Sequence, residues 1–422
     1  MTAAAVLALV ALLGLLLTSA QVVLVRRARR RPFLAPPAGA SPPDGSTRRP
    51  PRRVSVLKPL SGLDDGLEEN LASFARLTGV DHEVVLSVES PGDPALAVAR
   101  RVMARFPGAP FRLVVGEGTP GRLKNGKVDR LIAAARHAGG DVLLVSDSNV
   151  RVEPADVART VALFDDPSVG LVSNLFVAEG AADLGATVEA LHLLTFVLPG
   201  TALAASAGVP CVVGKSMAVT REALAAAGGL EAFLGVLAED QAMGLAVRRA
   251  GFRVLVSPVV VRNVVERRTL ARALDRQVRW GKIRYAFSRA TYAAELLVNP
   301  LPVAIAACGA SAVESPHRLG TFAGLAVLAG FVRLLQTRLL ERWTGAALPP
   351  GGTAAVLLAD LLRVWTHVVP FLSRSVAWHG LLARVGPGTA LLPPGRQLPG
   401  LDPLAAPGRT PPSMPQGTPV LT

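Results

Sequence analysis

The sequence predicts an α/β domain flanked by membrane helices at both ends of the chain. Three observations carry this prediction. Short β-branched runs alternate with helical stretches between residues 54 and 290, residues 1–25 contain no charged side chain, and further apolar runs follow Tyr292. The composition agrees, because 50% of the 422 residues are hydrophobic and 18% are charged, which is too apolar for an ordinary soluble protein.

Residues 1–25 form a predicted N-terminal transmembrane anchor. At about 1.5 Å of rise per residue, a helix of this length crosses a hydrocarbon core of about 30 Å. Five arginines follow directly in residues 26–31. A cleaved signal peptide carries its basic residues before the apolar stretch, so a retained anchor is favoured over an export signal, which is the alternative.

The arginines after the anchor also predict its orientation. Basic residues collect on the cytoplasmic side of a membrane, so the chain that follows is expected in the cytoplasm. The Ala- and Arg-rich composition is typical of a GC-rich, bacterial genome. We therefore expect an integral protein of the bacterial inner (plasma) membrane with a cytoplasmic catalytic domain.

Residues 26–53 are predicted to be a basic, Pro-rich linker, which holds much of the formal net charge of +14. Such a segment suits an anionic membrane surface. A nucleic-acid partner is not expected, because no basic helix carries interleaved aromatic side chains and aromatics make up only 5% of the chain. The two cysteines, Cys211 and Cys308, have no His/Cys cluster beside them in the sequence, so neither a disulfide framework nor a zinc site is proposed.

Residues 54–290 have the alternating pattern of an α/β domain with a largely parallel sheet. The predicted strands are Val54–Leu57, Glu83–Val88, Phe111–Val115 and Val142–Ser146, with helices near 67–77, 94–106 and 127–138. Ligands of such open sheets bind beyond the carboxyl ends of the strands. The polar residues that follow each strand are therefore the first candidates for a functional site.

Three groups of residues could bind an anionic, phosphate-containing ligand. Asp147 directly follows a predicted strand and could hold a divalent cation and a diphosphate, although an Asp there often only caps the next helix. Asp240 opens a helical stretch, where acidic residues also stabilise the helix dipole. Arg276 and Arg279 share one side of a basic helix beside Trp280 and could grip a diphosphate, or could simply form a solvated basic face.

The region after Tyr292 is predicted to hold membrane-associated helices between residues 291 and 380. Apolar runs lie near 296–313, 319–340 and 353–373, but Arg333, Asp360 and Arg363 interrupt them. An ionisable group in the middle of a bilayer costs about 2.5–3.5 kcal/mol, so these residues should face a protein interior, a groove or the interface, or the segments lie in the membrane plane. Residues 381–422 are predicted to be a Pro- and Gly-rich tail without a fold.

The run Leu191–Leu203 is also apolar and contains His192. It predicts either a buried helix with its turn or a further membrane contact. A histidine in such a run is more often a core or surface residue than a catalytic one.

Together these candidates resemble a known family. Asp93, Asp147, Asp240 and Arg276-x-x-Arg279-Trp280 are similar to the three aspartates and the (Q/R)xxRW motif of family 21 ceramide glucosyltransferases. The resemblance covers about residues 54–290. Further stretches resemble the same family, namely Ser55–Leu60, Leu67–Leu71, Asn125–Val128, Gly214–Met217 and Gly228–Leu230.

The resemblance implies a GT-A nucleotide-sugar (Rossmann-like) fold and transfer of glucose from UDP-glucose to the primary hydroxyl of ceramide, with inversion. It implies that Asp240 is the base, that Asp147 contacts a divalent cation, Mg²⁺ or Mn²⁺, and that Asp93 binds the nucleoside side of the donor. Asn149 replaces the second acid of many DxD motifs, which bears on metal affinity. Together with Asp93, the resemblance assigns donor binding to Lys58, Lys127, Asp147, Arg276, Arg279 and Trp280.

Three alternatives stay open. Hopanoid-type lipid N-acetylglucosaminyltransferases, which use UDP-GlcNAc, look similar and share a stretch like Asn299-Pro300-Leu301-Pro302. A processive polysaccharide synthase shares the (Q/R)xxRW motif but would need a channel of more and cleaner helices. A non-catalytic, membrane-tethered sugar-nucleotide-binding protein would not need a base such as Asp240.

Overall fold

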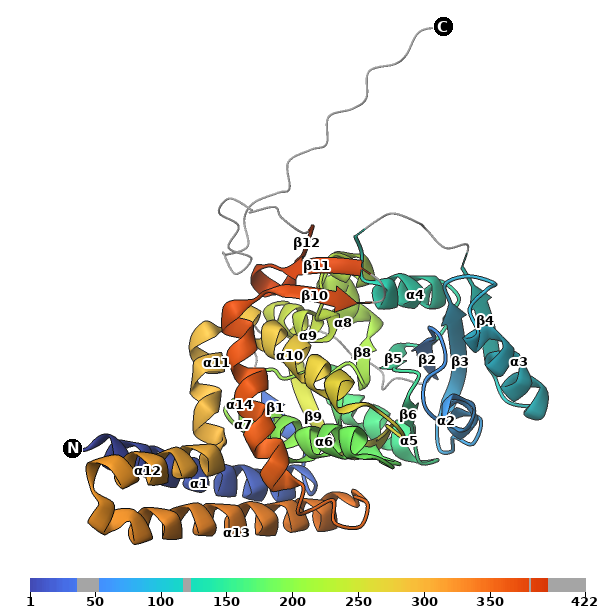
Figure 1. Cartoon of the computed structure of the whole chain (residues 1–422). Helices are drawn as coiled ribbons and strands as arrows, with labels where there is room; N and C mark the ends of the chain where they lie inside the picture. The colour runs from blue at the N-terminus through green and yellow to red at the C-terminus, as the bar shows by residue number, and fades with distance from the viewer. Residues whose placement is uncertain (36–52, 117–122, 379–380, 394–422) are drawn as a thin grey trace, which may run out of the picture.

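The centre of the protein is a nine-stranded mixed β-sheet (Figure 1). The computed structural model describes residues 1–35, 53–116, 123–378 and 381–393. The spatial order of the strands is β1-β9-β7-β8-β5-β2-β3-β4, and β6 pairs with β9. The strand bounds are β1 Phe33–Ala35, β2 Arg53–Pro59, β3 Asp81–Val88, β4 Phe111–Val115, β5 Val142–Ser146, β6 Val150–Arg151, β7 Val169–Glu179, β8 Ser216–Thr220 and β9 Arg253–Val264.

The four strands predicted from the sequence are confirmed as β2 to β5, and they pair in parallel. The prediction of a largely parallel sheet needs a correction on the other side of β5. There β8 runs antiparallel to both β5 and β7, while β1 and β6 run antiparallel to β9. Because Ser146 at the end of β5 pairs with Ser216 at the start of β8, the residues just before β8 lie at the carboxyl edge of the parallel strands.

Helices cover both faces of the sheet. Successive side chains of a strand point to opposite faces, so Val54 and Val56 of β2 belong to one apolar cluster and Leu57 to another. Helices α2 (Leu67–Phe74), α3 (Ala95–Arg105), α5 (Asp156–Val161) and α6 (Leu184–His192) contribute to the first cluster. Helices α4 (Gly126–Ala135), α8 (Arg221–Ala226) and α9 (Glu239–Arg249) contribute to the second. The helices predicted near 67–77, 94–106 and 127–138 are thereby confirmed as α2, α3 and α4.

A group of long apolar helices lies beside the sheet domain. Helices α1 (Ala3–Ala28), α12 (Pro300–Glu314) and α13 (Leu319–Thr344) pack on one another, as Figure 1 shows. By length and composition, Ala3–Ala28, Leu184–Ser206 and Pro316–Thr344 could each cross a membrane. A fourth candidate is the pair Arg289–Val298 and Pro300–Glu314, which is bent by 72°.

The segment Leu184–Ser206 differs from the other candidates because 72% of its most apolar window is buried inside the protein. It consists of α6, a π-helical turn η2 (Leu193–Val197) and α7 (Leu198–Ser206). The buried helix is therefore the better of the two predictions for the run Leu191–Leu203.

The remaining helices connect the sheet domain to this helical group. They are α10 (Leu270–Phe287), α11 (Arg289–Ala294) and α14 (Val356–Leu372). The 3₁₀ turns of the chain are η1 (Ala162–Asp165) and η3 (Leu230–Phe233) within the sheet domain, and η4 (Glu295–Val298), η5 (Pro316–Arg318) and η6 (Pro387–Thr389) after it. The three ionisable residues predicted to avoid lipid do so. Asp360 of α14 contacts both Arg333 of α13 and Arg363, and all three side chains are buried.

The structure moves two predicted boundaries. Residues 33–35, assigned to the linker, form β1 and pair with β9. A small sheet of β10 (Ser375–Trp378), β11 (Leu381–Val385) and β12 (Leu391–Leu392) extends into the segment predicted to be the tail. The physical reason is packing, because Val376, Ala383 and Val385 share an apolar cluster with Leu237. The other parts of the predicted linker and tail, 36–52 and 394–422, lie outside the described residues.

Candidate active site

The candidate site lies where β5 ends and β8 begins. Asp147 is the first residue after β5, and Lys215 is the last residue before β8. The antiparallel pairing of the two strands places these residues side by side, and the backbone N–H of Asp147 donates to the carbonyl of Lys215 at 3.2 Å. The sheet topology therefore fixes the first acidic and basic groups of the site.

Asp147 lies between two lysines. One carboxylate oxygen is 2.8 Å from Nζ of Lys127 and the other is 3.0 Å from Nζ of Lys215. Burial alone would raise the pKa of this carboxyl, but the two ammonium groups outweigh burial and hold the pKa of Asp147 well below its usual range. Asp147 is therefore ionised throughout the physiological pH range.

Helix α4 delivers Lys127 to the site. Asn125 caps this helix, because its side-chain oxygen accepts from the backbone N–H groups of Lys127 and Val128 at 3.0 and 3.3 Å. The amide nitrogen of Asn125 donates to Glu239 at 3.0 Å, and Nζ of Lys127 is 2.9 Å from the same carboxylate. The side chain of Asn125 thus caps the first turn of α4 and connects this helix to Glu239 at the start of α9.

The lysine is the electrostatic centre of this arrangement. Burial opposes the charge of Lys127, but Asp147, Glu239 and Asp240 together raise its pKa above the usual value. Lys127 therefore stays charged, pairs directly with Asp147 and Glu239, and interacts with Asp240 through charge.

Asp240, at the start of α9, is connected to Lys127 through the backbone of Gly214. Its carboxylate accepts from the backbone N–H of Gly214 at 2.6 Å and of Gln241 at 2.7 Å, and the carbonyl of Gly214 accepts from Lys127 at 3.1 Å. A Cβ at position 214 would lie 2.8 Å from Nζ of Lys127 and 3.0 Å from the Asp240 carboxylate. A side chain at position 214 would therefore displace the ammonium of Lys127 or the Asp240 carboxylate.

The environment of Asp240 keeps its carboxyl weakly acidic. Burial, followed by the neighbouring charge of Glu239, raises the pKa of Asp240 to about 6, although Lys127 and the two N–H donors oppose this shift. The carboxylate is thus ionised at neutral pH but basic enough to accept a proton. A pKa near the working pH is what a general base requires.

Arg276, on α10, is held by the buried carboxylate of Glu189, on α6. Arg276 donates to Glu189 at 2.8 Å and lies 5.1 Å from the ring centre of Trp280. Glu189 is 2% exposed at the side chain and also pairs with Arg268. Arg276 is therefore fixed by the protein, with Trp280 stacked against it.

Arg279 is less constrained. Within the described ranges, no carboxylate lies within ion-pair distance of its guanidinium, and its side chain is half-buried. Burial, and then the charge of Arg276, lowers the pKa of Arg279 to about 10. Arg279 stays protonated but lacks a counter-ion, which is the condition of a group that could bind an anionic ligand.

Electrostatics link the α10 group to the centre of the site. Burial lowers the pKa of Lys215, Asp147 opposes this, and the charge of Arg276 lowers it further. Arg276 therefore lies close enough to Lys215 for their charges to interact. Lys215 thus interacts both with the Asp147 carboxylate and with the charge of Arg276.

Two predicted residues lie outside this cluster. Asp93 follows β3, where its carboxylate accepts from the backbone N–H groups of Gly62 and Ala95 at 3.0 and 2.9 Å and so holds the loop after β2 against the start of α3. Lys58 is fully buried on β2, where it donates to the carbonyl of Asp147 at 2.8 Å. Burial lowers the pKa of Lys58 to about 7, and the side chain supports the Asp147 loop from behind.

The structure therefore brings Asp147, Asp240 and Lys127 together. It groups Arg276, Arg279 and Trp280 on α10, where Arg276 interacts with Lys215 only through charge, and it leaves Asp93 after the neighbouring strand β3. Sequence reasoning gave no role to four residues that build the site. Lys215 and Asn125 lie in stretches that resemble the family, and Glu239 precedes Asp240. Glu189 had a weaker signal, namely a lone carboxylate within the apolar run that ends α6.

The arrangement offers a metal ion few protein ligands. Within the described residues, no group of three or more His, Cys, Asp or Glu side chains could hold a metal. The side-chain oxygen of Asn149 is 2.9 Å from Nζ of Lys215, which leaves the Asp147 carboxylate as the candidate ligand. One carboxylate still fits Mg²⁺ or Mn²⁺ chemistry, because such ions commonly share protein, phosphate and water oxygens.

Comparison with known proteins gives a family match along most of the chain. The model of glycosyl transferase family 21 matches residues 6–391. Ceramide glucosyltransferase 3 of Caenorhabditis elegans is 28% identical over 255 residues, which are 59% of this chain and 53% of that protein. Ceramide glucosyltransferase 1 of the same organism is 28% identical over 240 residues, or 55% and 50% of the two chains. The chain thus spans about half the length of the curated relatives it matches.

Solved structures resemble the chain more distantly. The mannosyltransferase PcManGT from Pyrobaculum calidifontis, in complex with GDP-Man and Mn²⁺, aligns with a TM-score of 0.48 and 22% identity over 85% of this chain and 99% of that chain. Glucosyl-3-phosphoglycerate synthase from Mycobacterium tuberculosis, in complex with Mn²⁺ and UDP-Glc, aligns with a TM-score of 0.33 and 20% identity over 52% and 73% of the two chains.

Proposed function

The chain belongs to glycosyl transferase family 21, and from this premise we propose that it is a membrane-bound inverting transferase that moves glucose from UDP-glucose to the primary hydroxyl of ceramide. The match over residues 6–391, the mixed sheet and the apolar helices agree with the GT-A fold class expected from the motifs. The observation that carries the proposal is the contact of Lys127 with both Asp147 and the loop that holds Asp240. Through this contact, Lys127 connects Asp147, the proposed phosphate-binding residue, to Asp240, the proposed base.

Asp240 is the proposed base. A primary alcohol is a poor nucleophile until its proton is removed, and a positioned carboxylate contributes about 10²–10⁴-fold in rate. Asp240 accepts the hydroxyl proton while the acceptor oxygen bonds to the anomeric carbon. The bond from that carbon to the donor phosphate oxygen breaks, and its electron pair leaves with UDP. A single displacement of this kind inverts the anomeric centre and needs no covalent sugar–enzyme intermediate.

Basic groups stabilise the departing diphosphate. Among the residues that the structure describes, no carboxylate lies within ion-pair distance of Arg279, Arg276 is fixed beside it, and Lys127 and Lys215 contact Asp147 at the end of β5. Charges that are already in position stabilise negative charge as it develops without reorganisation. A divalent cation held by Asp147 would supply further positive charge to the same phosphates.

The remaining donor-binding assignments rest on the resemblance and on position. We assign Asp93, at the end of β3, to the nucleoside side of the donor, and Trp280 to a wall of the donor site. Lys58 acts through the loop of Asp147, to whose carbonyl it donates. In this arrangement Lys58 positions the phosphate-binding residues from below.

A lipid acceptor accounts for the membrane helices. The hydroxyl of a membrane lipid lies at the headgroup level, so the enzyme must hold its site at the interface. We propose that α1 and the helices after residue 291 do this in the bacterial inner membrane, with the sheet domain in the cytoplasm, because arginines follow α1 directly.

The test uses the full chain in lipid nanodiscs that contain either ceramide or a hopanoid acceptor. Each is supplied with UDP-glucose or UDP-N-acetylglucosamine and a divalent cation, and the lipid products are identified by mass spectrometry. Glucosylceramide is the expected product. A hexosamine-modified hopanoid would instead support the hopanoid-type alternative, and UDP-sugar binding without any product would support the non-catalytic one.

The base is tested separately by Asp240→Asn. This variant should lose at least about 10²-fold in turnover and keep its affinity for UDP within a few-fold. Asp165→Asn, at an exposed position on η1, is the matched control and should behave as the parent protein. Unchanged turnover in Asp240→Asn would refute the assignment.

A further inference from the structure

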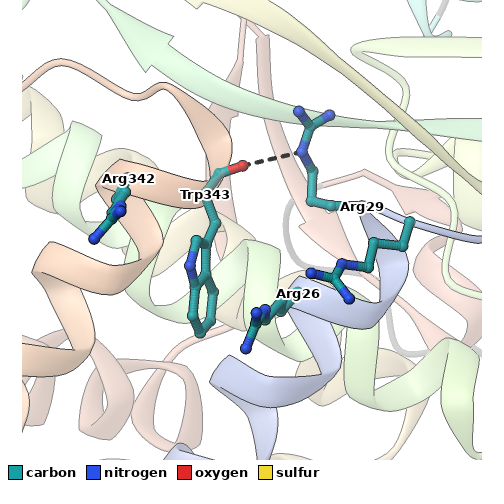
Figure 2. A pocket seen from close by; sticks show the side chains of 5 residues that line it. Arg26, Arg29, Arg342 and Trp343 are labelled. Carbon is teal, nitrogen blue, oxygen red and sulfur yellow. Dashed lines mark hydrogen bonds between the residues drawn. The ribbon is translucent and has the colours of Figure 1, made fainter.

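A basic pocket lies between the C-terminal ends of α1 and α13, far along the chain from the residues of the candidate active site. Its volume is about 460 Å³, which is within the range of ligand pockets. The residues that line it are Arg26, Arg29, Arg30, Arg342 and Trp343, and Figure 2 shows the arginines and the indole around it. Four of the five lining residues are therefore cationic, and none is acidic.

The pocket lies where two apolar helices end. The apolar part of α1 stops at Val25, directly before the arginines, and α13 ends one residue after Trp343. The side chain of Arg29 donates to the carbonyl of Trp343 at 3.1 Å, which shows that the two helix ends are level. Trp and Arg are the residues that collect where hydrocarbon gives way to headgroups.

Two of the lining residues are fixed by the protein itself. Arg29 also donates to the carbonyl of Pro258 at 2.7 Å, and the guanidinium of Arg26 lies 5.3 Å from the ring centre of Trp343. Pro258 lies in β9 where this strand has two extra residues opposite β7, so its carbonyl is available outside the sheet ladder. The pocket is thus joined to an edge of the sheet domain.

The positive charge of the pocket is not neutralised. Over the ranges that the structure covers, Arg26, Arg30 and Arg342 have no carboxylate within ion-pair distance, and all three are exposed. Cations are favoured at helix C-termini, but three guanidinium groups around one cavity still repel one another. An anion with several oxygen atoms would relieve this repulsion and could accept hydrogen bonds from more than one guanidinium.

The side chains below the pocket favour a lipid over a free anion. Val23 lies one turn before Arg26 and Leu335 two turns before Arg342, each on the same side of its helix as the arginine. Both are exposed, at 62% and 49%. A ligand with a phosphate in the pocket could therefore extend apolar chains along both helices.

From these observations we propose that the pocket binds the headgroup phosphate of an anionic phospholipid of the membrane. The phosphate lies among Arg26, Arg30 and Arg342, and the acyl chains follow the exposed apolar sides of α1 and α13. Because Arg29 joins these helix ends to β9, the bound lipid stabilises the junction between the helices and the sheet domain. This site is independent of the proposed transfer reaction.

The test measures lipid retention by the full chain without any assay of turnover. The protein is exchanged into nanodiscs of phosphatidylcholine, with or without phosphatidylglycerol, and retained lipids are counted by native mass spectrometry. The parent protein should keep phosphatidylglycerol preferentially and unfold at a higher temperature in its presence. The triple variant Arg26→Gln/Arg30→Gln/Arg342→Gln should weaken this preference by at least about tenfold, while its melting temperature in pure phosphatidylcholine reports whether it folds.

The matched control removes the same number of exposed arginines outside the pocket, by Arg31→Gln/Arg318→Gln/Arg338→Gln. It should keep the preference of the parent protein. Equal losses in the two triple variants, or no loss in the first, would overturn the proposal. A third arm adds inorganic phosphate to phosphatidylcholine nanodiscs, and a stabilisation equal to that by phosphatidylglycerol would show that the pocket recognises a free anion instead of a lipid.

Discussion

Two aspartates of this protein each lie between two cations, yet their surroundings differ. Asp147 contacts Lys127 and Lys215 at the end of β5, and its side chain is 23% exposed. Asp360 contacts Arg333 and Arg363 between helices, and its side chain is 0% exposed. Arg333 approaches Asp360 with two nitrogens, at 2.6 and 3.1 Å, whereas each lysine offers a single contact.

The difference teaches how the same charge pattern serves two purposes. A guanidinium forms a planar, bidentate pair with a carboxylate, while an ammonium is a compact point charge that changes partner readily. The pair of Arg333 with Asp360 locks α13 to α14 where lipid would be costly for any unpaired charge, and Arg363 supplies a second cation from α14 itself. The carboxylate between the two lysines is partly exposed, at 23%, so a ligand could reach Asp147 and its lysines, whereas Asp360 is closed off.

The largest expected effect comes from removing the buried carboxylate. Asp360→Asn leaves Arg333 and Arg363 without their counter-charge, which typically costs about 3–5 kcal/mol in the free energy of unfolding. Asp147→Asn, the matched change at the other aspartate, should cost less than half as much stability. Denaturant unfolding of both variants in the same detergent measures the difference, and equal losses would break the comparison.

The second prediction extends the comparison to the arginines of α10. Over the described part of the chain, no carboxylate lies within ion-pair distance of Arg279, whereas Arg276 is paired with Glu189. Arg279→Ala should therefore reduce kcat/KM by the equivalent of about 2–5 kcal/mol in transition-state stabilisation without a change in unfolding. Arg276→Ala should lower both quantities, because it leaves part of a buried carboxylate unpaired. A loss below about 1 kcal/mol for Arg279→Ala would mean that this side chain merely faces solvent.

The third prediction concerns pH. With the pKa of Asp240 raised to about 6, kcat/KM should fall by about tenfold per pH unit below pH 6, because a protonated carboxyl cannot act as the base. The pKa of Asp240 in the folded protein exceeds its ordinary value of 3.8. Between pH 3.8 and about pH 6, the folded protein therefore binds more protons at this carboxyl than the unfolded chain does. The contribution of Asp240 to stability is therefore present below pH 3.8 and is lost as pH rises through about 6.

Asp147 should behave in the opposite way, because its pKa is lowered. Its contribution to stability is present above the unfolded pKa and is lost as pH falls through the folded value. Unfolding measured across pH for the parent, Asp240→Asn and Asp147→Asn proteins separates the two contributions. A pH–rate profile that is flat between pH 5 and pH 7 would contradict the assignment of Asp240 as the base.

The smallest expected effect is that of Lys58→Met. Burial already lowers the pKa of Lys58 to about 7, so the loss of its charge and the loss of its hydrogen bonds partly offset each other, and we expect a change within about 1 kcal/mol in unfolding. KM for the UDP-sugar should change by a few-fold at most if Lys58 acts only through the Asp147 loop. A much larger rise in KM would place the ammonium in direct contact with the donor.

Local patterns in the sequence were enough to predict several strands, the N-terminal helix and the family of this protein. Alternating apolar residues located β2 to β5, the uncharged run before the arginines located α1, and the ordered motifs indicated the family. The same motifs predict Asp147, Asp240 and Arg276-x-x-Arg279-Trp280 as site residues. These features depend on near neighbours in the chain, because strand alternation repeats every two residues and a membrane helix needs only an apolar run of sufficient length.

Only the tertiary structure decided which charges are partners. The reversed direction of β8 sets Lys215 beside Asp147, the cap of α4 connects Asn125 to Glu239, and buried Glu189 fixes Arg276. It also decided that Arg333 meets Asp360. The physical reason is that an ion pair depends on where two element ends meet in space, and residues separated by tens of positions carry no local periodicity that records this meeting.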